Sequence, residues 1–350
     1  MRPIRRRPGE PLAPPLVPSS TYVLRGDPAG APFSYGRTAN PTWSALEAEY
    51  EAVGGAPCLA FASGMAACAA LVDALVAPGD RVVAPSDGYY TLRSLLGARR
   101  IDARLVASTE PLAFAEQAAN AALVWVETPS NPGLDIVDLR ATAEACRRAG
   151  ALLAVDNTLA TAAGQDPFAL GADVVVVSAT KATSGHSDAV IGLAAAKDPG
   201  ILEKLRAART IGGAIPGVLE AWLCLRGIHT LDLRIRRVSE TALAVARALA
   251  GRLPVRYPGL AEHPHHALAA RQMRHFGPVL TFDLETKERA EDFCGRLEHI
   301  VEATSFGGVE TSLERRARWG ADAVSPGLIR MSCGLEEPET ILAELNGALG

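Results

Sequence analysis

The sequence is built around the stretch Ser178-Ala179-Thr180-Lys181-Ala182-Thr183-Ser184-Gly185-His186-Ser187-Asp188. It follows the apolar run 173–177, which predicts a buried strand, so Lys181 stands just beyond a strand end among hydroxyls and a glycine. The chain prefers arginine, since Lys181 is its first lysine and only three more follow. Arginine supplies the same charge, but only a lysine amine can form an imine with a carbonyl. We therefore interpret Lys181 as a Schiff-base candidate.

Short apolar runs alternate with helical patterns over the first 200 residues. The strand-like runs cover residues 58–62, 81–84, 101–106, 122–127, 151–156, 173–178 and 190–195. The helix-like segments cover residues 43–53, 65–76, 90–97, 112–119, 137–149 and 167–170. This alternation predicts an α/β fold with a mainly parallel central sheet, and the near-continuous apolar strands predict helices on both of its faces. Ligands of such sheets bind beyond the carboxyl ends of the strands. Four polar side chains stand at such ends: Ser63, Glu127, Asp156 and Lys181.

Proline content and the change of pattern divide the chain into three parts. Residues 1–45 contain nine prolines, too many for a continuous helix or central strand, and are predicted to form an extended arm. Residues 46–225 are predicted to form the large α/β domain. Long helices follow over 201–250, broken near 212–213 and 216–217. Residues 226–350 combine a strand at 279–284 with helices at 289–299 and 338–349, which predicts a smaller α+β domain.

Composition and charge exclude several classes of partner. The chain has 350 residues, of which 48% are hydrophobic and 21% charged, as in ordinary globular enzymes. A formal net charge of -4 gives no general attraction to nucleic acid or to anionic membranes. No apolar stretch approaches the roughly 20 residues of a membrane span. Four N-terminal arginines are expected to form only a solvated tail: Arg2, Arg5, Arg6 and Arg7.

Cysteine and histidine usage predicts a protein without disulfides or bound metal. Six cysteines are scattered without a Cys-x-x-Cys pair, and residues 1–18 lack the continuous apolar segment of a secretion signal. We therefore expect reduced, mostly buried thiols and a cytoplasmic location. Four histidines gather between residues 263 and 275 without the helical His-x-x-x-His pair of a zinc site: His263, His265, His266 and His275.

An aldehyde cofactor that carries a pyridine ring and a phosphate has definite requirements. It needs a lysine for the imine, an acid at the ring nitrogen, a flat partner for the ring and a phosphate site. Lys181 meets the first requirement. Asp156 ends an apolar strand, where an unpaired carboxylate is costly, and pairing with a pyridinium would remove that cost.

The phosphate has a candidate site of its own in Ser63-Gly64-Met65, where a predicted strand turns into a helix. The free N–H groups and the dipole at such a helix start bind anions without any side-chain charge. Ser178 and Thr180 are two residues apart on an extended segment, so their hydroxyls can point the same way.

At this point the chain resembles the Cys/Met-metabolism family of pyridoxal-phosphate enzymes, whose motifs occur in the family's order from residue 35 to residue 336. The matching blocks are Tyr35-Gly36-Arg37, Asn40-Pro41-Thr42, Ser63-Gly64-Met65-Ala66-Ala67, Glu127-Thr128-Pro129-Ser130-Asn131-Pro132, Asp156-Asn157-Thr158, Ser178 to Lys181, Gly185-His186-Ser187-Asp188, Leu225-Arg226-Gly227, Ile329-Arg330-Met331-Ser332 and Gly334-Leu335-Glu336. The resemblance implies the aspartate-aminotransferase-like architecture called fold type I, with pyridoxal 5'-phosphate as cofactor.

The resemblance also implies a role for each matching cofactor residue. Lys181 forms the imine and moves protons between substrate carbons, Asp156 pairs with the pyridinium nitrogen, and Tyr89 stacks on the ring. The phosphate is held by Ser63, Gly64, Met65, Ser178 and Thr180. Tyr35 and Arg37 are similar to residues that reach the phosphate of a neighbouring subunit, which implies sites shared between chains.

For the substrate, the resemblance implies that Arg330 binds the α-carboxylate bidentately, with Asn131 and Ser305 nearby. The implied reaction is γ-elimination of cystathionine to cysteine, 2-oxobutanoate and ammonia, with Tyr89 able to protonate the departing sulfur. Alternatives are γ-replacement on an O-acyl-homoserine, methionine γ-lyase or β-lyase activity, or a catalytically silent protein that binds the cofactor. The implied assembly is a homotetramer, a dimer of dimers.

Besides Phe306, which stands where leucine is commoner in the family, two departures from the family pattern touch the expected pocket. The family usually continues the stacking tyrosine with Gly-Gly-Thr, but here the run is Tyr89-Tyr90-Thr91, which leaves Tyr90 as an alternative to Tyr89. The usual tyrosine after the lysine is replaced by Ala182, which predicts additional space there.

Overall fold

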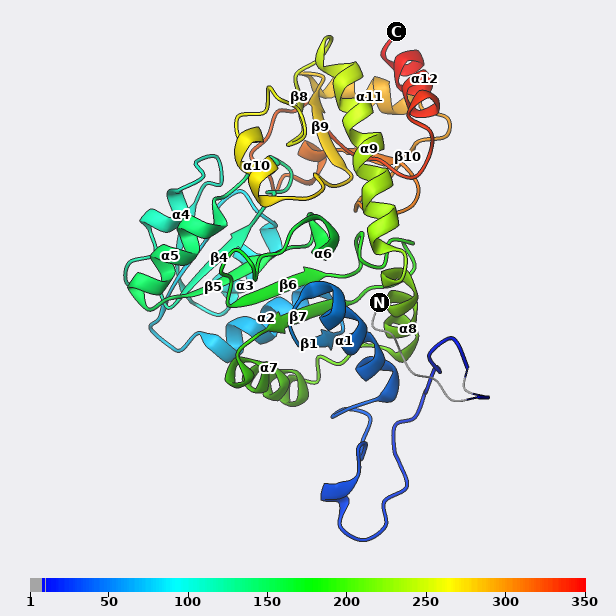
Figure 1. Cartoon of the computed structure of the whole chain (residues 1–350). Helices are drawn as coiled ribbons and strands as arrows, with labels where there is room; N and C mark the ends of the chain where they lie inside the picture. Colours follow the sequence, from blue (N-terminus) through cyan, green and yellow to red (C-terminus); the bar gives the residue numbers. More distant parts are fainter. Residues whose placement is uncertain (1–7, 10) are drawn as a thin grey trace.

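The computed structural model describes residues 8–9 and 11–350 (Figure 1). The arginine-rich segment expected to be a solvated tail lies at residues 2–7, outside the described residues. Residues that follow extend away from the body as an arm before α1 (Pro41–Gly54), whose first turn is capped by the side chain of Asn40. Asn40 Oδ1 accepts a hydrogen bond from the Thr42 N–H at 2.8 Å, and Pro41 stands at the first helical position, where no N–H is needed.

A seven-stranded sheet forms the centre of the larger part of the molecule. Its strands are β1 (Cys58–Phe61), β2 (Arg81–Pro85), β3 (Asp102–Val106), β4 (Leu123–Glu127), β5 (Leu152–Asp156), β6 (Val174–Ser178) and β7 (Gly192–Ala196). The order is β1-β7-β6-β5-β4-β2-β3, and only β7 runs antiparallel to its two neighbours. The predicted mainly parallel sheet is therefore confirmed, and its strands begin and end within two residues of the expected bounds.

Helices cover both faces of this sheet, as the apolar strands predicted. The helices of this part, besides α1, are α2 (Gly64–Leu75), α3 (Tyr90–Ala98), α4 (Ala113–Glu116), α5 (Leu139–Ala149), α6 (Thr161–Gly164), α7 (Pro199–Gly212) and α8 (Val218–Ile228). Buried side chains of α1, α4, α5 and α8 share one core cluster with the sheet, and those of α2, α3 and α7 share another. Each face of the sheet thus has its own apolar core.

Several expected helix boundaries are wrong. Residues 167–170 form a turn, closed by the Leu170 N–H on the Pro167 carbonyl, and Gly171 at φ +103° leads the chain away from helix. The short helix of this region is α6, which was not expected. The expected break near 212–217 separates α7 from α8, and a second break at His229-Thr230 separates α8 from α9 (Leu231–Ala250).

A five-stranded sheet forms the C-terminal part, as the expected smaller α+β unit. Its strands are β8 (Val255–Arg256), β9 (Val279–Asp283), β10 (Val301–Glu302), β11 (Ser312–Arg315) and β12 (Leu328–Ser332), in the order β10-β11-β12-β9-β8. Its helices are α10 (His266–Gln272), α11 (Lys287–Gly295) and α12 (Pro338–Leu349). The helix expected to reach 299 ends at Gly295, because the N–H groups of residues 298, 299 and 300 all donate to the Glu344 carboxylate on α12.

Helix α9 joins the two parts and also holds the loop that carries Lys181. Its later turns pack in the core of the smaller sheet (Figure 1). Arg234, near its start, contacts the loop after β6. Arg234 is 7% exposed and donates to the carbonyls of Ala182 at 2.6 Å, Thr183 at 3.2 Å and Gly227 at 2.8 Å. Gly185, at φ +79°, is required there, because a Cβ atom would lie 1.9 Å from the Arg234 guanidinium.

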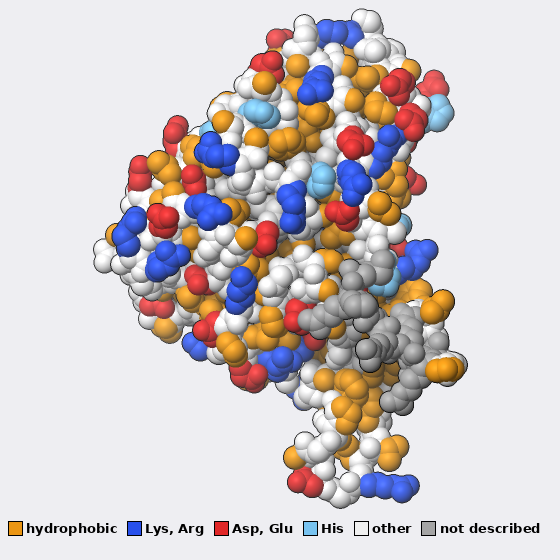
Figure 2. All heavy atoms as spheres, viewed as in Figure 1, with side chains coloured by type: hydrophobic (Ala, Val, Ile, Leu, Met, Phe, Trp, Pro, Cys, Tyr) orange, Lys and Arg blue, Asp and Glu red, His pale blue; other side chains and the backbone are white. Residues whose placement is uncertain are grey.

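None of the described helices combines the length and the apolar character needed to cross a membrane. On the face shown in Figure 2, acidic and basic side chains are interspersed over both parts.

We expect Arg234→Met to lower the free energy of unfolding by about 3 kcal/mol, because it leaves several buried carbonyls without a donor. The measurement is denaturant unfolding of the protein. The matched control is Arg236→Met on the same helix. The Arg236 side chain is 54% exposed and pairs with Asp232 one turn away, so the effect of this control should stay below about 0.5 kcal/mol. Equal effects of the two variants would contradict the role given to Arg234.

Candidate active site

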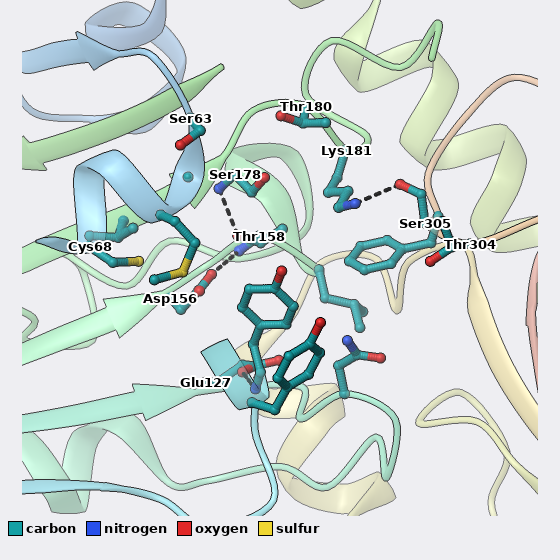
Figure 3. Close-up of a pocket in the computed structure, with 18 of the residues that line it drawn as sticks. Ser63, Cys68, Glu127, Asp156, Thr158, Ser178, Thr180, Lys181, Thr304 and Ser305 are labelled. Carbon is teal, nitrogen blue, oxygen red and sulfur yellow. Dashed lines mark hydrogen bonds between the residues drawn. The ribbon is translucent and has the colours of Figure 1, made fainter. Parts of the chain in front are cut away.

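One pocket gathers most of the predicted site residues. Its volume is about 450 Å³, and it opens beyond the carboxyl ends of β4, β5 and β6, between the two sheets. The predicted residues that line it are Ser63, Gly64, Met65, Tyr89, Asn131, Asp156, Ser178, Thr180, Lys181, Ser305 and Arg330. They come from segments far apart in the chain, and Figure 3 shows how those it labels converge on the cavity.

Lys181 enters the pocket from the loop after β6 and points toward the C-terminal part. Its Nζ donates a hydrogen bond to Ser305 Oγ at 2.6 Å (Figure 3) and lies 5.3 Å from the centre of the Phe306 ring. Burial, and then the charge of Arg330, lowers the pKa of the Lys181 amine from 10.5 to about 8. About a tenth of this amine is therefore unprotonated, and so nucleophilic, at pH 7, far more than for an ordinary lysine.

Asp156 lies on the opposite side of the pocket at the end of β5. Its Oδ1 accepts a hydrogen bond from the Thr158 N–H at 2.9 Å, and Thr158 Oγ1 accepts one from the Ser178 N–H at 2.8 Å (Figure 3). Burial raises the pKa of Asp156. Among the residues that the structure describes, no Lys, Arg or His side chain forms an ion pair with it. A cationic partner inside the pocket would thus relieve the cost of its charge.

Glu127 is the neighbour of Asp156 across the strands, since the two residues are opposite each other in the β4–β5 register. Glu127 is 8% exposed, and its Oε2 accepts a hydrogen bond from the Tyr89 N–H at 2.7 Å. Burial, and then the Asp156 charge, raises the pKa of Glu127 well above its usual value. Gly88 allows this approach, because a Cβ atom there would lie 2.7 Å from Glu127 Oε2.

The start of α2 forms a cradle against the end of β6. Ser63 caps the helix by accepting from the Ala66 N–H at 3.0 Å, and the first N–H groups of any helix have no partner within it. A Cβ atom on Gly64 would lie 2.7 Å from the Ser178 Cβ, so only glycine permits this contact. The Thr180 hydroxyl is engaged with the Ile191 backbone, donating to its carbonyl and accepting from its N–H.

Arg330 projects from β12 and is 4% exposed. Its Nη1 donates to Asn131 Oδ1 at 3.0 Å, and its Nη2 donates to the Ser305 carbonyl at 2.7 Å and to Glu314 Oε1 at 2.5 Å. Burial, and then the charge of Arg316, lowers the pKa of Arg330 to about 10, so the guanidinium remains charged at neutral pH. The expected grouping of Arg330 with Asn131 and Ser305 is therefore present in the geometry.

The two departures from the family pattern have different outcomes. Tyr89 and Tyr90 both line the pocket, with ring centres 5.3 Å apart, and the choice of Tyr89 as stacking partner stays a prediction. The space expected beside Ala182 is filled. Ala182 is buried against Leu231 and Ile235 of α9. Gly307 also approaches Ala182 so closely that a Cβ atom on residue 307 would lie 2.6 Å from the Ala182 N atom.

Tyr35 and Arg37 are not brought to the pocket of their own chain. Tyr35 is half exposed and pairs with Thr21 in an isolated bridge on the arm. Arg37 donates to the Thr210 carbonyl at 3.1 Å, and its guanidinium carbon lies 5.6 Å from the Tyr35 ring centre.

Several residues of the site were not singled out from the sequence, among them Thr158, Glu314, Arg316 and Trp319. Thr158 belongs to the matching block Asp156-Asn157-Thr158, so its place in that motif was the available signal. Arg316 and Trp319 line the pocket from a 3-10 turn (Arg316–Trp319) that follows β11, and no pattern in the sequence marked that turn.

The residues present suit pyridoxal phosphate. The cradle at Gly64 has unpaired helix N–H groups for a phosphate, Asp156 has no cationic partner among the described side chains, and Lys181 has an amine that is readily unprotonated. Within residues 8–9 and 11–350, no group of three or more His, Cys, Asp or Glu side chains is placed to hold a metal ion.

The pKa of Lys181 gives a prediction for the protein without cofactor. Lowering a lysine pKa increases the unprotonated fraction, so labelling of Lys181 by formaldehyde and cyanoborohydride should rise with pH and be half-maximal near pH 8. Peptide mass spectrometry would follow the label, with Lys181→Ala identifying the peptide signal. A midpoint near the ordinary value of 10.5 would contradict the burial and charge effects described here.

Comparison with known proteins agrees with this geometry. A Streptomyces coelicolor protein provisionally named cystathionine gamma-lyase is 47% identical over 97% of this chain and 89% of its own length. A cystathionine gamma-synthase of Mycobacterium bovis is 40% identical over 96% of this chain and 91% of its own length. The solved cystathionine gamma synthase of Xanthomonas oryzae pv. oryzae in complex with cystathionine superposes with a TM-score of 0.92, at 36% identity, over 96% of this chain and 92% of that one.

The family described as Cys/Met metabolism PLP-dependent enzyme matches residues 5–350, almost the whole chain. The sequence resemblance is thereby confirmed, and with it pyridoxal phosphate as the cofactor. The chain belongs to the PLP-dependent enzymes of Cys/Met metabolism.

Proposed function

We propose that this enzyme catalyses the γ-elimination of cystathionine to cysteine, 2-oxobutanoate and ammonia. The observation that carries the proposal is the double contact of Ser305, whose hydroxyl accepts from the Lys181 amine and whose carbonyl accepts from the Arg330 guanidinium. A base and an anion-binding group are thereby held side by side in one pocket, as an α-amino acid substrate requires. The similarity to a protein provisionally named cystathionine gamma-lyase supports this substrate.

Each pocket residue has a role in this proposal. Arg330 binds the substrate α-carboxylate through its remaining N–H groups, with Asn131 fixing its orientation. Lys181 removes the α proton and then moves a proton at the β carbon. Tyr89 donates a proton to the departing sulfur. Pyridoxal phosphate supplies the electron sink that makes the α proton acidic.

The same geometry supports the proposed cofactor contacts. Asp156 pairs with the ring nitrogen, which would provide the missing cation for its carboxylate, and Tyr89 stacks on the ring. The phosphate lies against the start of α2 and the end of β6, held by Ser63, Gly64, Met65, Ser178 and Thr180. The Thr180 hydroxyl is less available to the phosphate than the other groups, because it is already hydrogen-bonded to the Ile191 backbone.

γ-Replacement on an O-acyl-homoserine is the second candidate, supported by the relatives named cystathionine gamma-synthase. Elimination and replacement share the same pocket residues and differ in whether a thiol nucleophile is admitted. Methionine γ-lyase or β-lyase activity would use the same residues on another leaving group. A catalytically silent protein is the remote alternative, which any turnover with release of ammonia would eliminate.

We further propose a homotetramer of paired dimers, in which Tyr35 and Arg37 complete the phosphate site of a neighbouring chain. Both residues lie on the arm, outside their own pocket, and apolar side chains such as Leu16, Val23 and Leu24 are exposed on it. Figure 2 shows hydrophobic side chains gathered where the arm leaves the body. Such exposed apolar surface is typical of subunit contacts.

The division into an arm at 1–45, a large domain at 46–225 and a small domain at 226–350 stays a proposal, supported by the two separate sheets. A cytoplasmic location is also a proposal. Its support is that all six cysteines are free and buried, as in proteins of reducing compartments.

The reaction itself can be decided by product analysis. Incubation with cystathionine should release 2-oxobutanoate, cysteine and ammonia, and Lys181→Ala should lower kcat roughly a thousandfold or more because the proton carrier is lost. O-acyl-homoserine should be supplied with and without cysteine. A thioether product that forms faster than the keto acid would instead establish γ-replacement as the main reaction.

The shared site can be tested by mixing inactive chains. Chains with Tyr35→Phe and Arg37→Ala retain their own Lys181, and chains with Lys181→Ala retain an intact arm. Co-refolded mixtures should recover part of the activity, because some pockets then combine the intact lysine with an intact arm. An absence of rescue, with mixed oligomers shown by native mass spectrometry, would count against the shared site.

A further inference from the structure

A compact group of charges stands behind Arg330, at the border between the pocket and the smaller sheet. Glu314 is opposite Arg330 in the β11–β12 register and is fully buried. Its Oε1 accepts from Arg330 Nη2 at 2.5 Å and from Arg316 Nη1 at 2.7 Å. Its Oε2 accepts from the indole N–H of Trp319 at 2.7 Å. One carboxylate is therefore shared by two guanidinium groups and an indole.

Arg316 is also bound on its other edge. Its Nε donates to Asp322 Oδ2 at 3.1 Å, and its Nη2 donates to the same oxygen. Arg316 is 6% exposed, and the Asp322 side chain is 5% exposed. Although Arg316 lines the pocket, its donors are directed at Glu314 and Asp322, so it is poorly placed to bind a substrate anion itself.

The charges of this group balance. Two arginines face two carboxylates, so the group as a whole is neutral before any substrate carboxylate arrives. Without Arg316, Glu314 and Asp322 would outnumber Arg330, and the net charge behind it would be negative. At short range and low dielectric constant, that change would oppose the approach of an anion to Arg330.

The orientation of the Glu314 carboxylate also depends on Arg316 and Trp319. A carboxylate opposite a single arginine can turn to form a bidentate pair with it, which would occupy the donors that a substrate needs. Arg316 and Trp319 hold Glu314 by separate oxygens, and only one of those oxygens reaches Arg330. Glu314 then steadies Arg330 through one Nη2 N–H, and the Nε–H and the second Nη1–H of Arg330 keep no partner among the described residues.

We propose that Arg316 and Trp319 are positioning residues that restrain Glu314 and so keep Arg330 available for the α-carboxylate of the substrate. This inference rests on the proposed function, in which Arg330 binds that carboxylate. If the restraint is removed, the pocket should lose affinity for the substrate carboxylate, whereas the bound substrate should react at nearly the same rate.

The test uses the holoenzyme and the paired variant Arg316→Met/Asp322→Asn, which removes the restraint without leaving Asp322 as an unpaired charge. KM for cystathionine should rise about tenfold, whereas kcat should stay within about twofold. Adding Glu314→Gln to this variant removes the competing charge and should return KM most of the way to the original value. A merely structural role predicts the opposite, namely further damage from the third substitution.

A binding measurement separates carboxylate recognition from general loosening of the pocket. The probes are 4-(methylthio)butanoate, which lacks the amino group and cannot react, and its amide, each assayed as a competitive inhibitor. The paired variant should raise the inhibition constant of the acid about tenfold and leave that of the amide nearly unchanged. Trp319→Phe keeps a ring but loses the N–H donor, so it should raise the inhibition constant of the acid by a smaller factor.

Two further variants complete the experiment. Arg315→Met is the matched control, since Arg315 is the neighbouring arginine but pairs with Glu291 and the Pro326 carbonyl away from the pocket. It should leave both inhibition constants unchanged. Arg330→Leu should abolish the preference for the acid over the amide.

If Arg330→Leu leaves that preference intact, the role of Arg330 in the proposed function is wrong. If Arg330→Leu removes the preference but the paired variant and Trp319→Phe do not alter it, only the positioning role of Arg316 and Trp319 is overturned. Equal weakening of acid and amide in the paired variant would also overturn it.

Discussion

The hydrogen bond from the Lys181 amine to Ser305 Oγ joins the two sheets of the molecule at the point where the chemistry takes place. Lys181 comes from the end of β6 in the large sheet, and Ser305 precedes β11 in the small one. The carbonyl of Ser305 also accepts from Arg330, so one short loop sets the position of both groups. The pocket therefore depends on the two sheets keeping their relative placement, which α9 supports by holding the Lys181 loop through Arg234.

Charge is arranged in opposite ways on the two sides of the pocket. On the side of the large sheet, Asp156 and Glu127 are carboxyl groups without a cationic side chain as ion-pair partner in the described chain, and burial raises the pKa of both. On the side of the small sheet, Arg330 is a buried cation whose nearest carboxylate, Glu314, is shared with Arg316. The first side is suited to a cationic ring and the second to a carboxylate, which is the polarity that a pyridinium cofactor with an amino-acid substrate requires.

Much of this could be predicted from the sequence, because the relevant signals are local. The strand ends that carry Ser63, Asp156 and Lys181 follow apolar runs, and parallel strands bring their carboxyl ends to one edge. Other features depend on pairings between distant segments. Glu314 meets Arg330 only because β11 pairs with β12, and the filled space beside Ala182 depends on Gly307 and α9. The early end of α11 likewise depends on Glu344, about fifty residues further along the chain.

The central claim is that Lys181 is the residue that holds pyridoxal phosphate covalently in this pocket. Borohydride reduction of the holoenzyme, followed by proteolysis and mass spectrometry, tests it most directly. The account predicts a single pyridoxyl-phosphate adduct on the peptide that contains Lys181, with none on peptides of Lys197, Lys204 or Lys287. An adduct on another lysine, or a reduced protein without any adduct, would contradict it.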